Sequence, residues 1–195
     1  MLRRGLSALV CLVVIQAVSA SSGSAAGLDR CAGVPSTPVA LKSELDGLSW
    51  EPMLDAVPAM ASPSAEEQAY LMAIDQVHEH VRIDGSRIGM ATIMYSICEI
   101  DDVTFGSRLA SIRADLDQAA AVLASLPVPD RLGSVHRNYV QVVQLYEQGL
   151  DQMDRATQDG DAQHLRDAFP FTKTASDGLA MLETLVWGPP EPDVP

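Results

Sequence analysis

Basic and aromatic side chains are scarce in this sequence. It has 13 Lys and Arg residues against 26 Asp and Glu residues, and only 5% of its residues are aromatic. Binding to a nucleic acid or to anionic lipid headgroups depends on basic side chains that displace counterions. We therefore expect no nucleic-acid partner and no membrane partner. The apolar residues are mainly Ala, Leu, Val, Ile and Met, a composition that indicates helices.

Motifs that carry catalytic or cofactor chemistry are also lacking. The sequence has no His-Glu-x-x-His, no cysteine pair with zinc-finger spacing, no Cys-x-x-Cys-His and no paired Glu-x-x-His. These patterns supply the ligands of zinc, covalently attached haem and di-iron centres. No nucleophile, base and orienting group stand at motif spacing. We expect no cofactor and no enzymatic activity.

No apolar run reaches the roughly 20 residues that a membrane-spanning helix needs. The most marked run, residues 6–18, follows a pair of arginines and precedes small residues that end at Ala20 and Ala26. This order is typical of a secretory signal peptide over residues 1–26, cleaved after Ala20 or Ala26. The arginine pair also fits a twin-arginine export signal. We expect a soluble, secreted or extracytoplasmic product.

Cysteine is rare as well. Of the three cysteines, Cys11 leaves with the signal peptide, and Cys31 and Cys98 remain. In an oxidising compartment an isolated pair favours a disulfide. The predicted bridge ties residues 27–63, a Pro-, Ser- and Gly-rich arm in which prolines exclude long regular structure, to the rest of the chain. Residues 189–195 form a second Pro-rich segment, a short tail.

Between arm and tail, apolar residues recur at alternating spacings of four and three, the pattern of amphipathic helices. Ser64 with Glu67 forms a capping box at the start. The segment Asp-Gly-Ser at 84–86 either lies within one long first helix or breaks it into two. We expect Asp161 to cap the last helix and Pro170 to kink it. The predicted helices span residues 64–98, 103–126, 130–157 and 161–187. The clearest stripe is Phe105, Leu109, Ile112, Leu116, Ala119, Leu123 and Leu126.

The connections between these helices are about two to five residues long, so each helix packs beside its predecessor. The predicted fold is therefore all-α, an antiparallel up-down-up-down four-helix bundle with an irregular N-terminal arm. An extended coiled coil is the alternative, but short prolyl and glycyl turns favour packing within one chain.

Three apolar residues stand where the first helix should face water: Met90, Ile93 and Ile97. A helix that is apolar on every side is covered by something. We expect the arm to lie across this patch, held by the Cys31–Cys98 disulfide. A dimer interface is the alternative, since an uncovered apolar patch often marks one. The arm residues that could anchor it are Leu41, Leu48, Trp50 and Met53.

Several polar residues fall on inward-facing positions. Loop counting places Asp84 near the level of Tyr139, and a buried carboxylate needs hydrogen-bond donors. A small polar binding pocket is therefore one hypothesis, with Gly149 and Ala168 leaving room. The alternatives are that Asp84 faces water or pairs with an arginine, and that the tyrosines only fill space. The residues of the hypothetical pocket are Asp84, Tyr139, Tyr146 and Thr172.

Two further groups of polar residues are weaker candidates. Glu99, Asp101 and Asp102 lie in the first interhelical loop, where they could bind a hard cation or favour the start of the next helix. His136 is expected to be a hydrogen-bonded residue at the edge of the core. His78 and His80 diverge by about 200° around a helix, so we do not expect them to share a ligand.

The sequence thus predicts a secreted, non-enzymatic helical-bundle protein. Its role is expected to be that of an extracytoplasmic interaction or structural module, with a protein partner or a second copy of itself. The alternative is a binder of a small ligand or metal ion, through the interior of the bundle or through the acidic loop.

Overall fold

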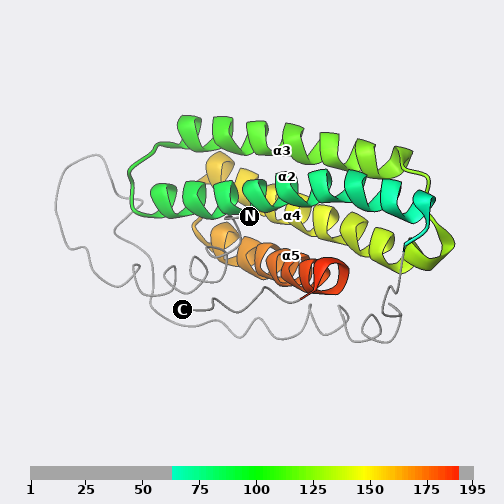
Figure 1. The fold of residues 1–195 in the computed structure, drawn as a ribbon. Helices are drawn as coiled ribbons and strands as arrows, with labels where there is room; N and C mark the ends of the chain where they lie inside the picture. Colours follow the sequence, from blue (N-terminus) through cyan, green and yellow to red (C-terminus); the bar gives the residue numbers. More distant parts are fainter. Residues whose placement is uncertain (1–62, 189–195) are drawn as a thin grey trace, which may run out of the picture.

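The computed structural model describes residues 63–188, and its secondary structure is all helical (Figure 1). This range contains no strand, which confirms the all-α prediction. Apart from Pro63, the predicted signal peptide, arm and tail lie outside the described residues. None of the helices in the described range is long and apolar enough to cross a membrane. The elements are α2 Ala65–Ser96, α3 Asp102–Ser125, the short 3-10 helix η3 Asp130–Leu132, α4 Gly133–Asp159 and α5 Gln163–Trp187.

α2 is one continuous helix that begins with the expected capping box. Ser64 Oγ accepts a hydrogen bond from the Glu67 N–H (3.2 Å), and the Ser64 N–H donates to Glu67 Oε2 (2.7 Å). The helix runs through the segment 84–86 without a break. Gly85 serves close packing there, because a Cβ at this position would overlap the Tyr146 hydroxyl of α4.

Short polar side chains and a glycine mark the ends of the other helices. At the start of α3, Asp101 accepts a backbone hydrogen bond of 2.8 Å. Gly160 ends α4 in the left-handed conformation, with φ 74°. Asp161 accepts a hydrogen bond from the Gln163 N–H (2.8 Å), although the cap position of α5 itself falls on Ala162. The predicted cap, Asp161, is therefore one residue before the observed cap position. Its side chain still satisfies a free backbone N–H at the start of α5.

The helices share one apolar core. All residues of the predicted α3 stripe are buried except Leu126, which is half-buried. α4 likewise buries residues at four-and-three spacing: Val135, Tyr139, Val142, Tyr146, Gly149, Met153 and Ala156. Each helix contributes large side chains that are fully buried, among them Ile74, Ile88, Phe105, Leu109, Tyr139, Tyr146, Leu150 and Leu182.

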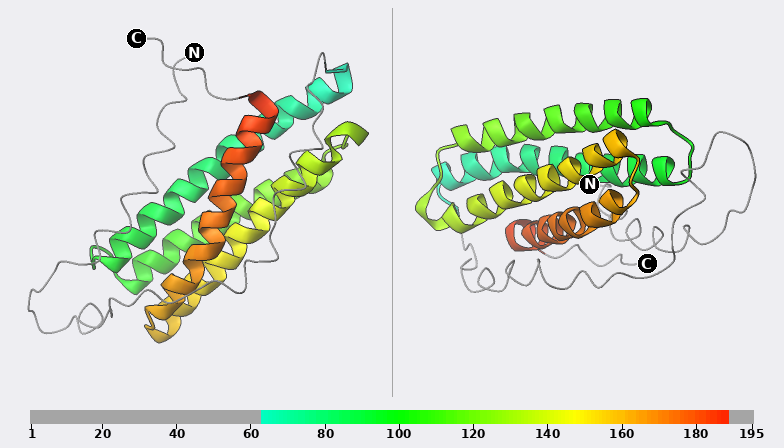
Figure 2. Two further views of the ribbon diagram at one scale, coloured as in Figure 1. Left: turned by 90° about the horizontal axis from the view of Figure 1, so that it is seen from below. Right: turned by 180° about the vertical axis from the view of Figure 1, so that it is seen from behind.

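α5 packs mainly against α4, whereas α2 and α5 meet over a shorter stretch. Figure 2 shows α5 running obliquely to the other helices, so that its C-terminal end approaches α2. Gly149 allows α4 and α5 to come close, since a Cβ there would lie 2.6 Å from Thr172 Cγ2. The room that Gly149 was expected to leave is therefore occupied on this side by the Thr172 methyl group. Pro170 lies inside α5.

Candidate functional site

Asp84, the first residue of the hypothetical pocket, forms an ion pair instead. Asp84 is 2% exposed, and Arg87 Nη1 donates to Asp84 Oδ1 over 2.7 Å. Arg87 also bonds to Asp115 and Ser111 of α3, so one guanidinium joins α2 to α3. Burial raises the pKa of Asp84, while Arg87 acts in the opposite direction. The observed arrangement is the alternative in which Asp84 pairs with an arginine.

The other three residues of that hypothesis each have a different partner. The Tyr146 hydroxyl bonds to Ser176 Oγ of α5 (2.9 Å). The Thr172 hydroxyl turns back to backbone carbonyls of its own helix. Tyr139 bonds to His78 of α2. In the described residues, these hydrogen bonds lead from Asp84, Tyr139 and Tyr146 to different partners, and a binding pocket shared by Asp84, Tyr139, Tyr146 and Thr172 stays a prediction. Loop counting also misplaced Asp84 along the helices, because Tyr139 meets His78, six residues earlier in α2, whereas Tyr146 lies against Gly85, next to Asp84.

Two tyrosine–histidine pairs join α2 to α4, and sequence reasoning did not predict them as pairs. The Tyr139 hydroxyl lies 2.9 Å from His78 Nδ1, and the Tyr70 hydroxyl lies 3.2 Å from His136 Nδ1. The second pair confirms that His136 is hydrogen-bonded at the edge of the core. In the sequence, His78 stands out only as half of a His-x-His pattern with His80. Its place directly after the inward-facing Val77 was the available signal.

His78 has an unusual environment among these four side chains. It is 5% exposed, and its ring meets the Trp187 ring of α5 edge to face, with centroids 4.9 Å apart. Its Nε2 lies 3.9 Å from Glu183 Oε2 of α5, which is beyond hydrogen-bond distance. Within residues 63–188, this nitrogen has no hydrogen-bond partner. A buried polar atom without a partner is rare in native proteins.

Burial sets the protonation states of both pairs. It lowers the pKa of His78, against the opposing effect of Glu183, and it lowers the pKa of His136. It raises the pKa of Tyr70 to about 12 and raises that of Tyr139 further. At neutral pH the imidazoles are neutral and the phenols protonated. In these states each tyrosine–histidine pair can form a hydrogen bond between helices. A protonated phenol is also a poor nucleophile.

Two of the three loop carboxylates proposed as weak cation ligands have structural roles of their own. Asp101 caps α3, and Asp102 Oδ1 accepts a hydrogen bond from the Tyr95 hydroxyl (2.7 Å). Glu99 is exposed. In the part of the chain that the structure describes, no three His, Cys, Asp or Glu side chains gather in a way that could hold a metal ion. The cation hypothesis for Glu99, Asp101 and Asp102 is therefore not supported.

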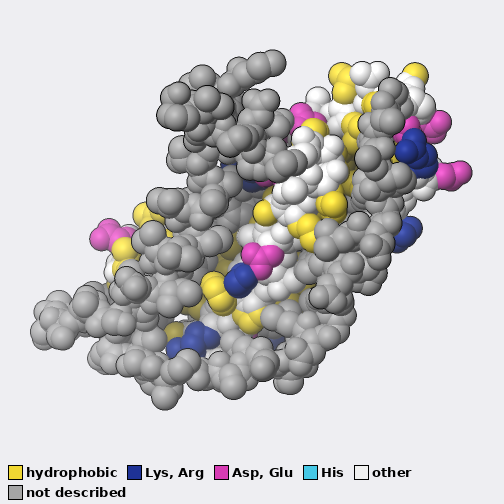
Figure 3. Space-filling view, turned by 60° about the horizontal axis from the view of Figure 1, so that its bottom comes forward, with side chains coloured by type: hydrophobic (Ala, Val, Ile, Leu, Met, Phe, Trp, Pro, Cys, Tyr) yellow, Lys and Arg dark blue, Asp and Glu magenta, His cyan; other side chains and the backbone are white. Residues whose placement is uncertain are grey.

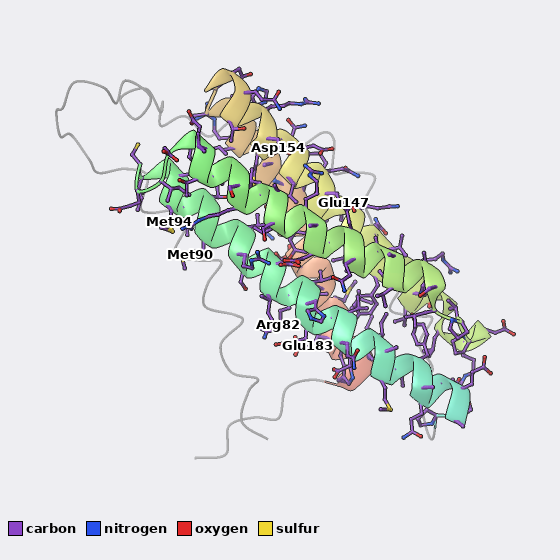
Figure 4. The ribbon with its side chains drawn as sticks, turned by 90° about the horizontal axis from the view of Figure 1, so that it is seen from above. Arg82, Met90, Met94, Glu147, Asp154 and Glu183 are labelled. Atoms are coloured by element: carbon purple, nitrogen blue, oxygen red, sulfur yellow. The ribbon has the colours of Figure 1, made fainter. Side chains whose placement is uncertain are left out.

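The predicted patch on α2 reaches the surface. Met90 is 58% exposed and Ile97 is 50% exposed, while Ile93 is half-buried. Met90 and Met94 lie on the C-terminal half of α2 (Figure 4), and Met94 Sδ accepts a hydrogen bond from Arg108 of α3. On the α5 side of the molecule, apolar side chains also lie between scattered charged ones (Figure 3). The arm expected to cover the patch lies outside the described residues, so this cover stays a prediction.

Cys98 stands at the end of α2 in a conformation that favours glycine. Its φ is 62°, its N–H bonds to the Tyr95 carbonyl (3.1 Å), and the Glu99 N–H bonds to the Met94 carbonyl (2.9 Å). These two bonds form a Schellman motif, whose left-handed residue is usually Gly. A side chain there costs about 1 kcal/mol. Cys31 lies outside the described residues, so the predicted bridge remains a prediction.

Comparison of the chain with protein-family models, with curated proteins and with solved structures finds no match. The described residues form an all-helical domain with a single core. Its side chains are the basis for the function proposed below.

Proposed function

We propose that this chain is an exported, non-enzymatic helical protein that serves as an extracytoplasmic interaction or structural module. The observation that carries the proposal is the use of its buried polar groups. Tyr139 bonds to His78, Tyr146 to Ser176, and Asp84 to Arg87, so these groups hold neighbouring residues of the scaffold together. Export is supported by the order of charged, apolar and small residues in 1–26.

The proposed scaffold is an antiparallel up-down-up-down four-helix bundle. In the α2–α3 pair, the late residue Met94 contacts the early residue Arg108, while Arg87 contacts Asp115 further along α3. In the α4–α5 pair, Tyr146 meets Ser176 and the later Gly149 meets the earlier Thr172. In each pair, contacts that come later in one helix come earlier in the other, as antiparallel neighbours require. Between α2 and α4 the register runs in the same direction, from Tyr70–His136 to Thr92–Met153, as expected of helices two apart.

The arm is the proposed occupant of the α2 patch, held there by a Cys31–Cys98 disulfide. Pro63 directly precedes the capped start of α2, whereas Cys98 follows its end, and a helix of 32 residues is about 48 Å long. Residues 31–63 can reach about 100 Å when extended, so the bridge is within reach. A bridged arm has to run back along α2, where Met90 and Ile97 are exposed. Cys in place of the favoured Gly at position 98 also supports a role for its thiol.

Light scattering and the binding of an apolar dye test this arrangement in the exported protein. By light scattering we expect a monomer. We expect this monomer to bind little dye, and we expect Cys31→Ser to increase dye binding by freeing the arm. Met90→Lys should remove part of that increase, whereas Met72→Lys is the control, because Met72 is 69% exposed at the other end of α2. A dimer that Met90→Lys dissociates would instead make a second copy the occupant. A monomer whose dye binding does not respond to Cys31→Ser would contradict the arm.

A further inference from the structure

We propose that His78 is an acid-sensitive latch, which holds the C-terminal end of α5 against α2 while its ring is neutral and releases it when the ring is protonated. The ring lies where three helices meet. It contacts Tyr139 of α4 and Trp187 of α5, and its Nε2 faces Glu183 of α5. The proposal rests on this geometry and is independent of the function proposed above.

The neutral ring fits its site with one tautomer. The Tyr139 hydroxyl is fully buried, and its hydrogen bond goes to His78 Nδ1. With Tyr139 as the donor, Nδ1 is the acceptor and the ring proton is on Nε2. That proton points toward the Glu183 carboxylate, which remains 3.9 Å away from Nε2. The neutral ring thus satisfies Tyr139 and presents an uncharged N–H to the Glu183 carboxylate of α5.

Protonation disturbs both sides of this arrangement. Both ring nitrogens then carry a proton, so Nδ1 can no longer accept from Tyr139. The Tyr139 hydroxyl must turn to accept, and its own proton then loses the His78 acceptor inside the core. The ring also acquires a charge at a position that is 5% exposed, and burying a charge is costly unless it is closely paired.

The charged groups around the ring do not offset this cost. Glu183 of α5 and the acidic Asp75 and Glu79 of α2 favour the protonated ring, whereas Arg82 of α2 opposes it. Arg82 and Glu183 lie beside each other at this end of the α2–α5 contact (Figure 4). Burial outweighs all of them, so the pKa of His78 is lowered. Glu183 itself is more than one-third exposed and is too far away for a hydrogen bond.

Release should be confined to the end of α5 that contacts α2. Trp187 lies against His78 in the last turn of α5. The middle of α5 is held separately by α4, through Tyr146 with Ser176 and through the close contact of Gly149 with Thr172. Acid should therefore loosen the last turns of α5 before the α4–α5 contact.

Trp187 fluorescence tests the latch directly. The chain has two tryptophans, so Trp50→Phe leaves Trp187 as the sole reporter. As the pH falls from 8 to 4.5, we expect the emission to shift to longer wavelength, with a midpoint below about 6.5, the ordinary value for histidine. His78→Gln should abolish the shift in this range. His136→Gln, which alters the other tyrosine–histidine pair, should retain it. A shift that survives His78→Gln, or no shift in the parent protein, would overturn the proposal.

Two further measurements keep the test valid even if His78→Gln folds poorly. The NMR titration of the His78 ring in the otherwise unchanged protein should have the same midpoint as the fluorescence shift, and different midpoints would contradict the latch. Glu183→Gln removes the nearest carboxylate and should move that midpoint to lower pH. An unchanged midpoint would show that Glu183 does not act on His78. Amide exchange in acid should rise first in residues 183–187, and an equal rise in residues 146–150 would mean general unfolding.

Discussion

The Tyr146 hydroxyl of α4 lies against the backbone of Gly85 in α2, where no side chain would fit. Gly85 stands in the middle of a continuous helix, a position at which Gly costs about 1 kcal/mol relative to Ala. The glycine is therefore explained by contact between α2 and α4, and not by a turn.

Gly85→Ala should destabilise the protein although alanine is the better helix former. The new Cβ would overlap Tyr146, and overpacking of a core typically costs about 1–3 kcal/mol. Gly89→Ala, one turn further along α2, is the matched control. Its Cβ would meet nothing within 4 Å among the described residues, so it should stabilise the protein by up to about 1 kcal/mol. Urea unfolding of both variants measures the difference, and equal effects would contradict the close contact.

Gly149→Ala should separate α4 from α5. A Cβ at Gly149 would lie 2.6 Å from Thr172 Cγ2, so we expect a loss of about 1–3 kcal/mol in the free energy of unfolding. Thr172→Ser removes the clashing methyl group and should restore part of this stability in the double variant. Thermal unfolding of the two single variants and the double variant checks the coupling. Strictly additive effects would show that the two residues do not compete for the same space.

Arg87→Met should leave the buried Asp84 carboxylate without its cation. Arg87 is itself partly exposed, so solvent reduces the effect, and we expect a loss of about 1–3 kcal/mol. Lys173→Met is the control, since it breaks an exposed pair with Asp177 and should change stability by less than about 1 kcal/mol. Denaturant unfolding at neutral pH compares them. If Arg87→Met is as mild as the control, the Arg87 guanidinium stabilises neither the buried Asp84 carboxylate nor the α2–α3 contact.

Stability should decrease in mild acid. The pKa values of His78 and His136 are lowered in the folded protein, so the unfolded chain takes up protons first as the pH falls below about 6.5. The histidine contribution is therefore complete above that pH and is lost progressively toward the folded-state pKa values. Urea unfolding at pH 7.5 and at pH 5.5 measures this, and His78→Gln should reduce the difference. Greater stability at pH 5.5 than at pH 7.5 would contradict the buried, neutral rings.

The helices and their buried stripes could be predicted because the four-and-three spacing depends only on local sequence. The residues of the α3 stripe show this, since all but Leu126 are buried. Partners across helices could not be predicted in the same way. Asp84 and Tyr139 are expected at a similar level, but Tyr139 meets His78, six residues before Asp84, and Asp84 pairs with Arg87 of its own helix. Gly85 suggests a break in the helix when only its neighbours in sequence are considered. The contact that explains a glycine there is with the Tyr146 hydroxyl, which is distant in sequence.

The most direct test of the proposed exported, disulfide-held module is mass analysis of the exported protein, digested without reduction. The account predicts a mature N-terminus directly after Ala20 or Ala26 and one linked peptide pair that contains Cys31 and Cys98. An uncleaved N-terminus together with two free thiols at these positions would contradict it.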